Sequence, residues 1–459
     1  MTRAIDTTIA ELEALFGSQV TRSESARRLH GDDLSYLPAM LPDAVFFARS
    51  TAEVSRALAL CNAHGTPVIP FGTGTSIEGQ THAVKGGISI DLSAMNAVLA
   101  VHAEDFDAVV QPGVTRKQLN AYLRDSGLSF PVDPGADASI GGMASTRASG
   151  TNAVRYGTMR ENVLALEVVL PDGEVIRTGS RARKSSTGYD LTKMFVGAEG
   201  TLGIITEATV RLHPIPQAIS SAVCTFATVK GAVDAVIATM QSGVPVARIE
   251  FLDEVAIEAA NNYSKLSLEV APTLFIEFHG TEAGIAEQAG IVEVLAGDFG
   301  GEGFQWATRP EDRERLWKAR HDSNPATRAL RPGSATFATD ACVPISALAD
   351  NILAARADAD ASFLRAKING HVGDGNFHVS YLVMPGAEEE IREAERLAAG
   401  VVERALASGG TASGEHGVGL GKLRFLRAEH GPALKLMRTL KASIDPNGIM
   451  NPGKLGTLA

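Results

Sequence analysis

The chain has 459 residues, 45% of them hydrophobic, and a formal net charge of −11 at pH 7. This length allows two or three domains with well-packed cores, and the acidic balance argues against binding nucleic acid or anionic membrane through broad basic patches. The three cysteines, Cys61, Cys224 and Cys342, form no CxxC pair, which favours a reducing compartment. Because no apolar run suits a signal peptide or a transmembrane helix, we expect a cytoplasmic protein, with peripheral attachment to a membrane left open.

Local signals predict the elements of the N-terminal part of the chain. Apolar residues between Ile9 and Phe16 recur at helical spacing, so residues 1–40 are interpreted as one or two helices without a chemical role. Ser50 and Glu53 have capping-box spacing, which predicts a helix that ends at Gly65. Further on, we expect strands at 88–92, 99–102 and 108–111, a helix at 117–124, and a hairpin over 163–178 that turns at Asp172 and Gly173.

Two loops have the composition of a phosphate-binding cradle. The first, VIPFGTGTSIEGQ at 68–80, combines glycines that allow close backbone approach with hydroxyls that can converge on an anion, although a tight surface turn would explain it equally well. The second, PVDPGADASIGGMASTRASGTNAVRYG at 131–157, is too long for a simple connection, and its apolar flanks argue against disorder. Together they indicate a dinucleotide lying between them. Neither fits the GxGxxG pattern after a strand, so a Rossmann domain is not expected.

Two prolines within His213–Pro216 mark the expected boundary between two domains. Beyond it, strand-like runs alternate with amphipathic helices, which predicts an α+β layer over one sheet. The expected strands lie at 218–228, 247–251, 273–278 and 336–339, and the expected helices at 229–240, 283–295 and 309–328.

Two histidines that flank GDGN are candidates for a metal site. Asp374 and Gly375 favour a two-residue hairpin turn, which would place His371 directly opposite His378 on one face of the sheet. The Cβ atoms of such a pair lie about 4.5–5.5 Å apart, close enough for both imidazoles to bind one ion. Histidines satisfied by hydrogen bonds on a sheet face are the alternative. On a glycine-flanked loop, the adjacent residues 415 and 416 are the remaining candidates for a third ligand and for a separate role.

Further motifs, together with the two loops, resemble the vanillyl-alcohol oxidase and p-cresol methylhydroxylase (PCMH) flavoprotein family over most of the chain. They are QPGVT at 111–115, AEGTLGIITEATVRLHP at 198–214, HVGDGNFH at 371–378, SGEHGVG at 413–419 and IDPNGIMNPGK at 444–454. Within this family, RIEFLDEVAIEAANNYSKL and LWKARHD resemble FAD-dependent D-lactate dehydrogenases most. The resemblance implies an α+β protein with a helical segment at 1–40, a PCMH-type FAD-binding domain of two subdomains at 41–216, and a substrate and metal domain on an antiparallel sheet at 217–457.

The resemblance implies FAD that is held noncovalently, because neither loop has a histidine or cysteine where some members attach the flavin. A buried hairpin at 198–206 and a C-terminal turn around residue 451 are the structural alternatives for two of the segments involved. The residues assigned to FAD are Pro70, Gly72, Thr73, Gly74, Thr75, Ser76, Gly79, Gln80, Pro134, Gly135, Ala136, Ser139, Ile140, Gly141, Gly142, Ser145, Gly150, Ala153, Val154, Glu199, Gly200, Ile204, Ile205 and Asn451.

The resemblance also implies roles at the substrate. Glu415 joins the two histidines as a ligand of a divalent metal, zinc or manganese, and His416 is the catalytic base. Arg320 aligns with an arginine that holds the substrate carboxylate, although an arginine on a helix is more often solvated. Ser380 stands where relatives that act on longer diacids carry asparagine, which favours a small substrate.

The implied function is oxidation of a D-2-hydroxy acid, with hydride transfer to flavin N5. The first candidate substrate is D-lactate, which would be oxidised to pyruvate. The electron acceptor would be a cytochrome, a quinone or an electron-transfer flavoprotein, and a homodimer is left open. Oxidation of glycolate or D-2-hydroxyglutarate is an alternative on the same fold. A flavin-dependent alkyl transferase and a non-catalytic flavoprotein subunit are alternatives of a different class.

Overall fold

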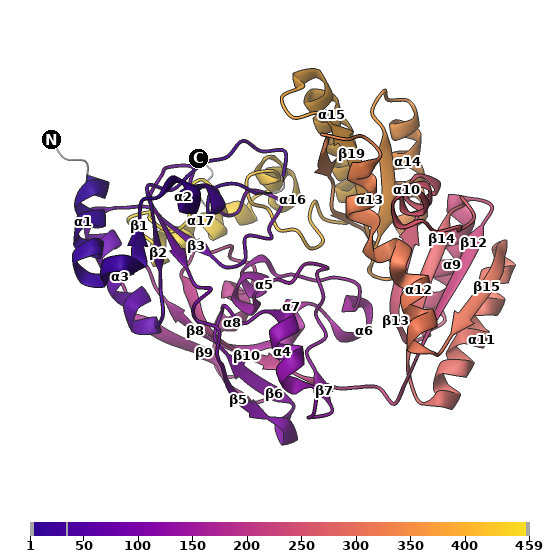
Figure 1. Ribbon diagram of the computed structural model, residues 1–459, viewed down its shortest axis with the longest axis horizontal. Helices are drawn as coiled ribbons and strands as arrows, with labels where there is room; N and C mark the ends of the chain where they lie inside the picture. Colours follow the sequence, from indigo (N-terminus) through magenta and orange to yellow (C-terminus); the bar gives the residue numbers. More distant parts are fainter. Residues whose placement is uncertain (1–3, 34, 456–459) are drawn as a thin grey trace. The chain divides into compact units, whose positions relative to one another are not determined.

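The computed structural model describes residues 4–33 and 35–455, which form two compact units (Figure 1). Unit 1 contains the described residues up to Ser149, then Gly157–Ile215 and the described residues from Glu415 onward. Unit 2 contains Gly150–Tyr156 and Pro216–Gly414. The C-terminal segment therefore belongs with the N-terminal part of the chain. None of the helices in the described ranges combines the length and the hydrophobicity needed to span a bilayer.

A four-stranded sheet in the order β1-β2-β4-β3 forms the first part of unit 1. Between β2 and β3, the Ser50 hydroxyl accepts the N–H of Glu53 and Gly65 takes a left-handed φ of 62°, so the helix predicted from these caps is confirmed as α3. Its buried face packs in the core of this sheet. The elements are α1 Ala4–Phe16, β1 Val20–Thr21, α2 Glu24–Leu29, β2 Ala44–Phe47, α3 Thr51–His64, β3 Val68–Phe71 and β4 Ile88–Asp91.

A five-stranded antiparallel sheet in the order β5-β6-β10-β8-β9 forms the second part of unit 1. The predicted hairpin is present as β8 and β9, and Gly173 in its turn has a φ of 92°. The strands are β5 Val98–His102, β6 Asp107–Val110, β8 Val163–Val169, β9 Val175–Gly179 and β10 Ile204–Arg211, with β7 Leu128–Ser129 paired to β11 His213–Pro214. The helices of unit 1 beyond α3 are α4 Arg116–Leu123, α5 Ile140–Thr146, α7 Met159–Asn162, α8 Leu191–Phe195, α16 Leu426–His430 and α17 Ala433–Ile444.

Unit 2 is built on one eight-stranded sheet in which every strand pair is antiparallel, as expected. The order is β15-β12-β14-β13-β18-β19-β16, with β17 also paired to β19. The strands are β12 Ala218–Phe226, β13 Val246–Leu252, β14 Thr273–Gly280, β15 Gly301–Ala307, β16 Ala335–Ala338, β17 Ala341–Cys342, β18 Ala366–Gly370 and β19 Asn376–Val383. The helices are α6 Ala153–Tyr156, α9 Val229–Gln241, α10 Glu254–Ser264, α11 Glu282–Asp298, α12 Pro310–His321, α13 Ser323–Ala329, α14 Leu348–Asp360 and α15 Glu388–Ala407.

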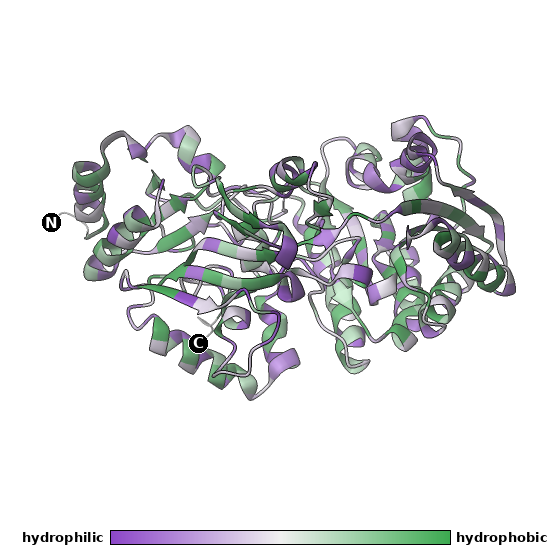
Figure 2. Ribbon diagram, turned by 90° about the horizontal axis from the view of Figure 1, so that it is seen from below, coloured by the Kyte–Doolittle hydropathy of each residue, from purple (hydrophilic) through white to green (hydrophobic). Residues whose placement is uncertain are grey.

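Helices cover both faces of this sheet. On one face, Trp317 of α12 and Ala256 of α10 pack with Val223 and Phe275 of the sheet. On the other face, Gly231 of α9 approaches the ring of Phe226, whose side chain points opposite to that of Val223. In Figure 2, the helices carry both hydrophobic and hydrophilic stretches, as amphipathic helices do when one side is buried.

The face covered by α10, α12 and α13 also carries a row of polar side chains. The register pairs Ser221 with Glu277, and Leu252 with Asn369, so Glu250 lies on this face too. Lys367, Asn369, His378 and Ser380 continue the row on β18 and β19. All of these polar residues are buried.

One helix prediction was wrong. The single helix expected over 309–328 is two helices, α12 and α13, which divide at Asp322. The Asp322 carboxylate accepts hydrogen bonds from the Ser264 hydroxyl and, at 2.7 Å, from Nζ of Lys318. The contact with Ser264 comes from a distant part of the chain, and the helical periodicity of 309–328 does not reveal it.

Candidate active site

The loop after β3 exposes a run of backbone N–H groups. Within the described residues, the N–H groups of residues 73–77 donate to no protein acceptor. The hydroxyls of Thr73 and Thr75 lie beside them, 3.4 Å apart and exposed. Gly74 and Gly79 take left-handed φ angles of 65° and 73°, which only glycine adopts at little cost. This arrangement suits the oxygens of a phosphate group.

The second predicted loop lies directly against the first. The Thr73 hydroxyl accepts the N–H of Ser139 at 3.4 Å, and a Cβ on Gly72 would lie 2.4 Å from the Ser139 hydroxyl. A Cβ on Gly141 would lie 2.5 Å from Pro112, so this approach also requires glycine. The loops form one cradle within unit 1, and its N–H groups and hydroxyls fit a pyrophosphate-bearing group such as FAD.

The end of the second loop belongs to unit 2. Gly150, Ala153 and Val154, which were expected at the flavin, fall in the segment 150–156, where Ala153–Tyr156 forms α6. A Cβ on Gly373 would lie 2.9 Å from Cγ2 of Val154, so Val154 packs against the turn that follows His371.

Glu199 and Asn451 brace the loops of unit 1. The Glu199 carboxylate accepts the N–H groups of Val418 and Gly419 at 2.6 and 2.9 Å. The Asn451 amide donates to the carbonyls of Gln80 and Glu199 at 3.1 and 2.8 Å. These two side chains therefore hold the first loop, the segment around residue 199 and the loop at 415–419 together.

His416 lies in unit 1, on the loop that Glu199 holds. Its carbonyl accepts a hydrogen bond from the Gln80 amide at 2.7 Å. Nδ1 of His416 lies 4.0 Å from Oε1 of Glu78, and Nε2 lies 3.7 Å from Oε1 of Glu415. Lys422 forms a 2.9 Å ion pair with the same Glu78 oxygen. The candidate base is therefore fixed to the loop system that forms the flavin cradle.

The predicted register of the two candidate histidine ligands was wrong. Strand β18 ends at Gly370, and residues 372–374 form a short 3₁₀ turn, so the connection is longer than the two-residue turn expected. His378 pairs with Asn369, not with His371. The two imidazoles nevertheless meet edge to face, with ring centroids 5.5 Å apart. Both Nδ1 atoms face oxygen acceptors, Glu250 for His371 and the Thr339 carbonyl for His378, so each ring would bind a metal through Nε2.

Arg320 lies next to the same carboxylate that holds His371. Its Nε donates to Oε2 of Glu250 at 2.7 Å, and the Arg320 side chain is 17% exposed. In the part of the chain that the structure describes, its terminal nitrogens have no hydrogen-bond acceptor. A planar guanidinium held in this way can present two donors to a carboxylate.

Sequence reasoning missed three buried charges around these residues. Glu250 is fully buried, and Lys367 donates to the Ser323 hydroxyl at 2.7 Å, where burial and then the charge of Arg320 lower the pKa of the lysine to about 7. Asp340 accepts hydrogen bonds from Asn376 and Ser413 and lies 3.6 Å from Nδ1 of His378. For Glu250 and Lys367, the available signal was a charged residue between two apolar neighbours in a strand.

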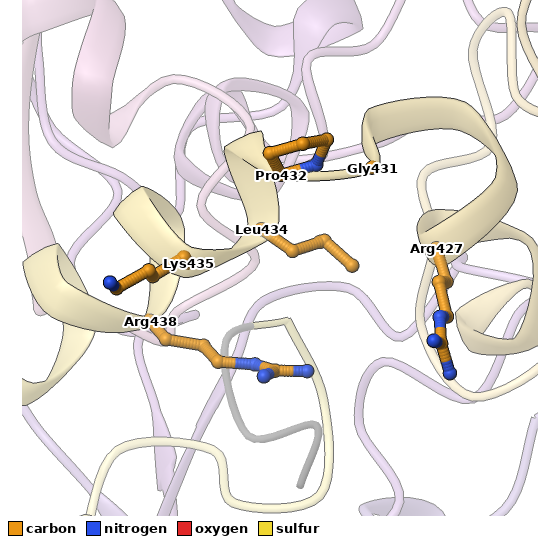
Figure 3. Close-up of a pocket in the computed structure, with 6 residues that line it drawn as sticks. All are labelled: Arg427, Gly431, Pro432, Leu434, Lys435 and Arg438. Carbon is orange, nitrogen blue, oxygen red and sulfur yellow. The ribbon is translucent and has the colours of Figure 1, made fainter.

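A separate pocket in unit 1 contains none of the predicted site residues (Figure 3). It is lined by Arg427, Gly431, Pro432, Leu434, Lys435 and Arg438. Figure 3 shows the Leu434 side chain extending into the space between Arg427 and Arg438. Its lining has cationic and apolar groups but no acid, base or nucleophile suited to the chemistry described above.

Comparison with known proteins assigns the chain to a family. Residues 42–179 match the FAD binding domain family, and residues 215–455 match the FAD linked oxidases, C-terminal domain. This protein belongs to the FAD-linked oxidase family. The family assignment agrees with the flavin cradle in unit 1 and with the antiparallel sheet of unit 2.

Curated relatives extend over nearly the whole chain. A probable D-lactate dehydrogenase, mitochondrial, of Danio rerio is 51% identical over 99% of this chain and 92% of the relative. A D-lactate dehydrogenase (cytochrome), mitochondrial, of Arabidopsis thaliana is 49% identical over 97% of this chain and 79% of the relative. Glycolate oxidase subunit GlcD of Bacillus subtilis is 33% identical over 94% of this chain and 93% of the relative.

Solved structures show the same fold at lower identity. p-Cresol methylhydroxylase with substrate bound aligns with a TM-score of 0.81 and 20% identity, over 99% of this chain and 97% of that one. Alkyldihydroxyacetonephosphate synthase aligns with a TM-score of 0.76 and 22% identity, over 98% of this chain and 86% of that one. The PCMH-type fold expected from the motifs is confirmed.

The expected cytoplasmic location is contradicted by the relatives. The names of the Danio rerio and Arabidopsis thaliana proteins, and of a Saccharomyces cerevisiae relative, place those proteins in mitochondria. The expectation rested largely on the composition of the chain and its cysteine usage, which do not separate one reducing compartment from another.

Proposed function

We propose that this FAD-linked oxidase is a D-lactate dehydrogenase that oxidises D-lactate to pyruvate and passes the electrons to a cytochrome. The observation that carries the proposal is the arrangement in unit 2, where the paired imidazoles of His371 and His378 share a neighbourhood with the anchored guanidinium of Arg320. A 2-hydroxy acid offers such a site a hydroxyl and a carboxylate. The names of the Danio rerio and Arabidopsis thaliana relatives support D-lactate as the acid and a cytochrome as the acceptor.

Arg320 binds and orients the substrate in this scheme. Its Nε is held by Glu250, so the terminal nitrogens can form a bidentate contact with the substrate carboxylate. With the carboxylate held by Arg320 and the hydroxyl held at the proposed metal site, the Cα–H points in different directions in D-lactate and in L-lactate. The site can thereby distinguish the two enantiomers of lactate.

His371, His378 and Glu415 would hold the divalent metal, zinc or manganese. Two neutral imidazoles and one carboxylate are a common donor set for zinc. When bound, the metal supplies a Lewis acid that polarises the substrate hydroxyl. The hydrogen bond from Nδ1 of His371 to Glu250 fixes the ring orientation that such binding requires.

His416 takes the hydroxyl proton in this scheme. Carboxylates of Glu78 and Glu415 lie 4.0 and 3.7 Å from its ring nitrogens and would stabilise the cation that forms when the ring accepts a proton. The hydrogen bond from Gln80 to the His416 carbonyl ties the base to the flavin loops. Bound noncovalently in the cradle of unit 1, the flavin supplies the acceptor for the hydride of Cα.

Glycolate is the second candidate substrate. The Bacillus subtilis relative is named as a glycolate oxidase subunit, and glycolate has the same hydroxyl and carboxylate as D-lactate without the methyl group. The small side chain of Ser380, buried on β19, is compatible with either acid. The likeness to alkyldihydroxyacetonephosphate synthase is a likeness of fold, so it lends no weight to a transferase.

Turnover with a panel of acids tests the proposal. The purified protein is incubated with oxidised cytochrome c and with D-lactate, L-lactate, glycolate or D-2-hydroxyglutarate, and both cytochrome reduction and the 2-oxo acid are measured. We expect pyruvate from D-lactate to form with the highest kcat/KM. A higher kcat/KM with glycolate would favour the second candidate, and no 2-oxo acid from any of the four would contradict hydroxy-acid oxidation.

A further inference from the structure

One buried carboxylate contacts both His371, the candidate metal ligand, and Arg320, the candidate clamp that would bind the substrate carboxylate. Glu250 lies on β13 and is fully buried. Its Oε1 accepts from Nδ1 of His371 at 2.6 Å, and its Oε2 accepts from Nε of Arg320 at 2.7 Å. The two partners are 121 and 70 positions away in the chain, one at the end of β18 and the other on α12. The fold therefore converges on Glu250 from three separate elements.

The carboxylate of Glu250 is ionised in this setting. The guanidinium of Arg320 places a permanent positive charge 2.7 Å from Oε2, and an ionised carboxylate balances that charge. An ionised carboxylate accepts and never donates, so His371 must carry its proton on Nδ1 and present the lone pair of Nε2. With one oxygen used by each partner, the plane of the carboxylate fixes both side chains at once.

We propose that Glu250 is a positioning residue that couples metal binding to substrate binding. It orients His371 as a metal ligand and Arg320 as the clamp for the substrate carboxylate, and it touches neither metal nor substrate itself. This inference rests on the proposed function, which assigns those roles to His371 and Arg320. Because both depend on one side chain, a change at Glu250 must alter two separate properties together.

Unit 2 contains a matched control for this inference. Glu277, also buried and on the same face of the sheet, accepts from Nε2 of His279 at 2.8 Å and lies 3.4 Å from Nε of Arg248. Nδ1 of His279 lies 2.6 Å from the Tyr156 hydroxyl. Both nitrogens of this ring are therefore used inside the protein, so His279 is not available to a metal. Like Glu250, Glu277 is a buried carboxylate next to one histidine and one arginine, but it has no part in the proposed function.

The test compares Glu250→Gln with Glu277→Gln. Flavin-loaded protein is stripped with a chelator, its Zn²⁺ dissociation constant is measured by competition, and KM for D-lactate is measured after reloading. For Glu250→Gln we expect the Zn²⁺ dissociation constant to rise about 10- to 100-fold and KM to rise about tenfold or more, with flavin content unchanged. For Glu277→Gln we expect both values within about twofold of the wild-type values.

The result that overturns the coupling is a Glu250→Gln protein in which only one of the two values changes, or neither. Glu250→Asp provides a second test if the uncharged variant does not fold. It keeps the negative charge, but its shorter side chain cannot reach both partners, so both values should again rise. A wild-type protein that binds no Zn²⁺ or leaves D-lactate unoxidised would instead contradict the proposed function, which separates the two failures.

Discussion

The imidazole rings of His371 and His378 meet edge to face in unit 2, with their planes at 85°. His371 begins the turn after β18, and His378 lies on β19 with its Nδ1 3.2 Å from the Thr339 carbonyl. Each ring is thus held from its Nδ1 side. In the proposed metal site, both rings bind through Nε2.

Replacing either histidine should remove the metal. We expect His371→Ala and His378→Ala to retain less than about a tenth of the wild-type metal content. Loss of either imidazole ligand should greatly lower the affinity of the site for the metal. The flavin spectrum should persist, since the cradle lies in unit 1. Metal analysis of the purified variants checks this, with His279→Ala as the control that keeps its metal. Unchanged metal in both site variants would remove these histidines from the site.

The flavin should be released from the protein by heat or acid. Neither loop of the cradle contains a histidine or a cysteine that could form a covalent link to FAD. After precipitation, the yellow colour is expected in the supernatant, where chromatography identifies FAD. Colour that stays with the precipitated chain would contradict noncovalent binding.

Arg320→Ala should mainly raise KM for D-lactate. The guanidinium binds the substrate carboxylate in the ground state and in the transition state alike. Its loss should therefore weaken the binding of both states by about 10- to 100-fold, while kcat falls less. Arg320→Lys should not restore KM, because an ammonium group cannot bind Glu250 through Nε and still offer two donors to the substrate. Steady-state kinetics of both variants decide, and a large fall in kcat at unchanged KM would argue against a clamp.

His416→Ala should lower kcat by about 10² to 10⁴ while flavin and metal remain bound. The base acts only as the proton leaves, so KM should change little. Raising the pH should restore part of the rate, because hydroxide from the solvent can accept the proton instead. Stopped-flow reduction of the flavin across pH measures this, and wild-type rates in the variant would exclude His416 from the mechanism.

Lys367 should make stability depend on pH. In the folded protein its pKa is lowered to about 7 from an ordinary value of 10.5, mainly by burial. Between these pH values the unfolded chain binds more protons than the folded chain, so stability should rise with pH by up to about 1.4 kcal/mol per unit. Lys367→Met should flatten this rise. Urea unfolding of both proteins at several pH values checks it, and parallel pH profiles would contradict the lowered pKa.

Much of the local structure follows from residues close together in the chain. Ser50, Glu53 and Gly65 bound α3, and Asp172 with Gly173 turns the β8–β9 hairpin, because caps and tight turns depend on neighbouring residues. The strand-like runs expected at 218–228, 247–251, 273–278 and 336–339 are likewise present in unit 2, as β12, β13, β14 and β16. These features needed no knowledge of the rest of the fold.

The turn between His371 and His378 shows what local signals miss. A Cβ on Gly375 would lie 2.1 Å from the Val343 carbonyl, and one on Gly373 would lie 2.4 Å from Ile249. Contacts with Ile249 of β13 and with Val343, both distant in the chain, thus set this turn, and they override the preference of Asp-Gly for a two-residue hairpin. Glu250 escaped notice for the same reason, since its partners are assembled only when β13, β18 and α12 meet.

Anaerobic reduction of the bound flavin by the two enantiomers of lactate tests the central claim most directly. Oxidised, metal-loaded protein is mixed with D-lactate or L-lactate without an acceptor, and the visible absorbance of the flavin is followed. We expect D-lactate to bleach the flavin within the time of one turnover and to yield about one pyruvate per flavin, while L-lactate leaves the spectrum unchanged. A flavin that stays oxidised with D-lactate, or that both enantiomers bleach at the same rate, would contradict the account.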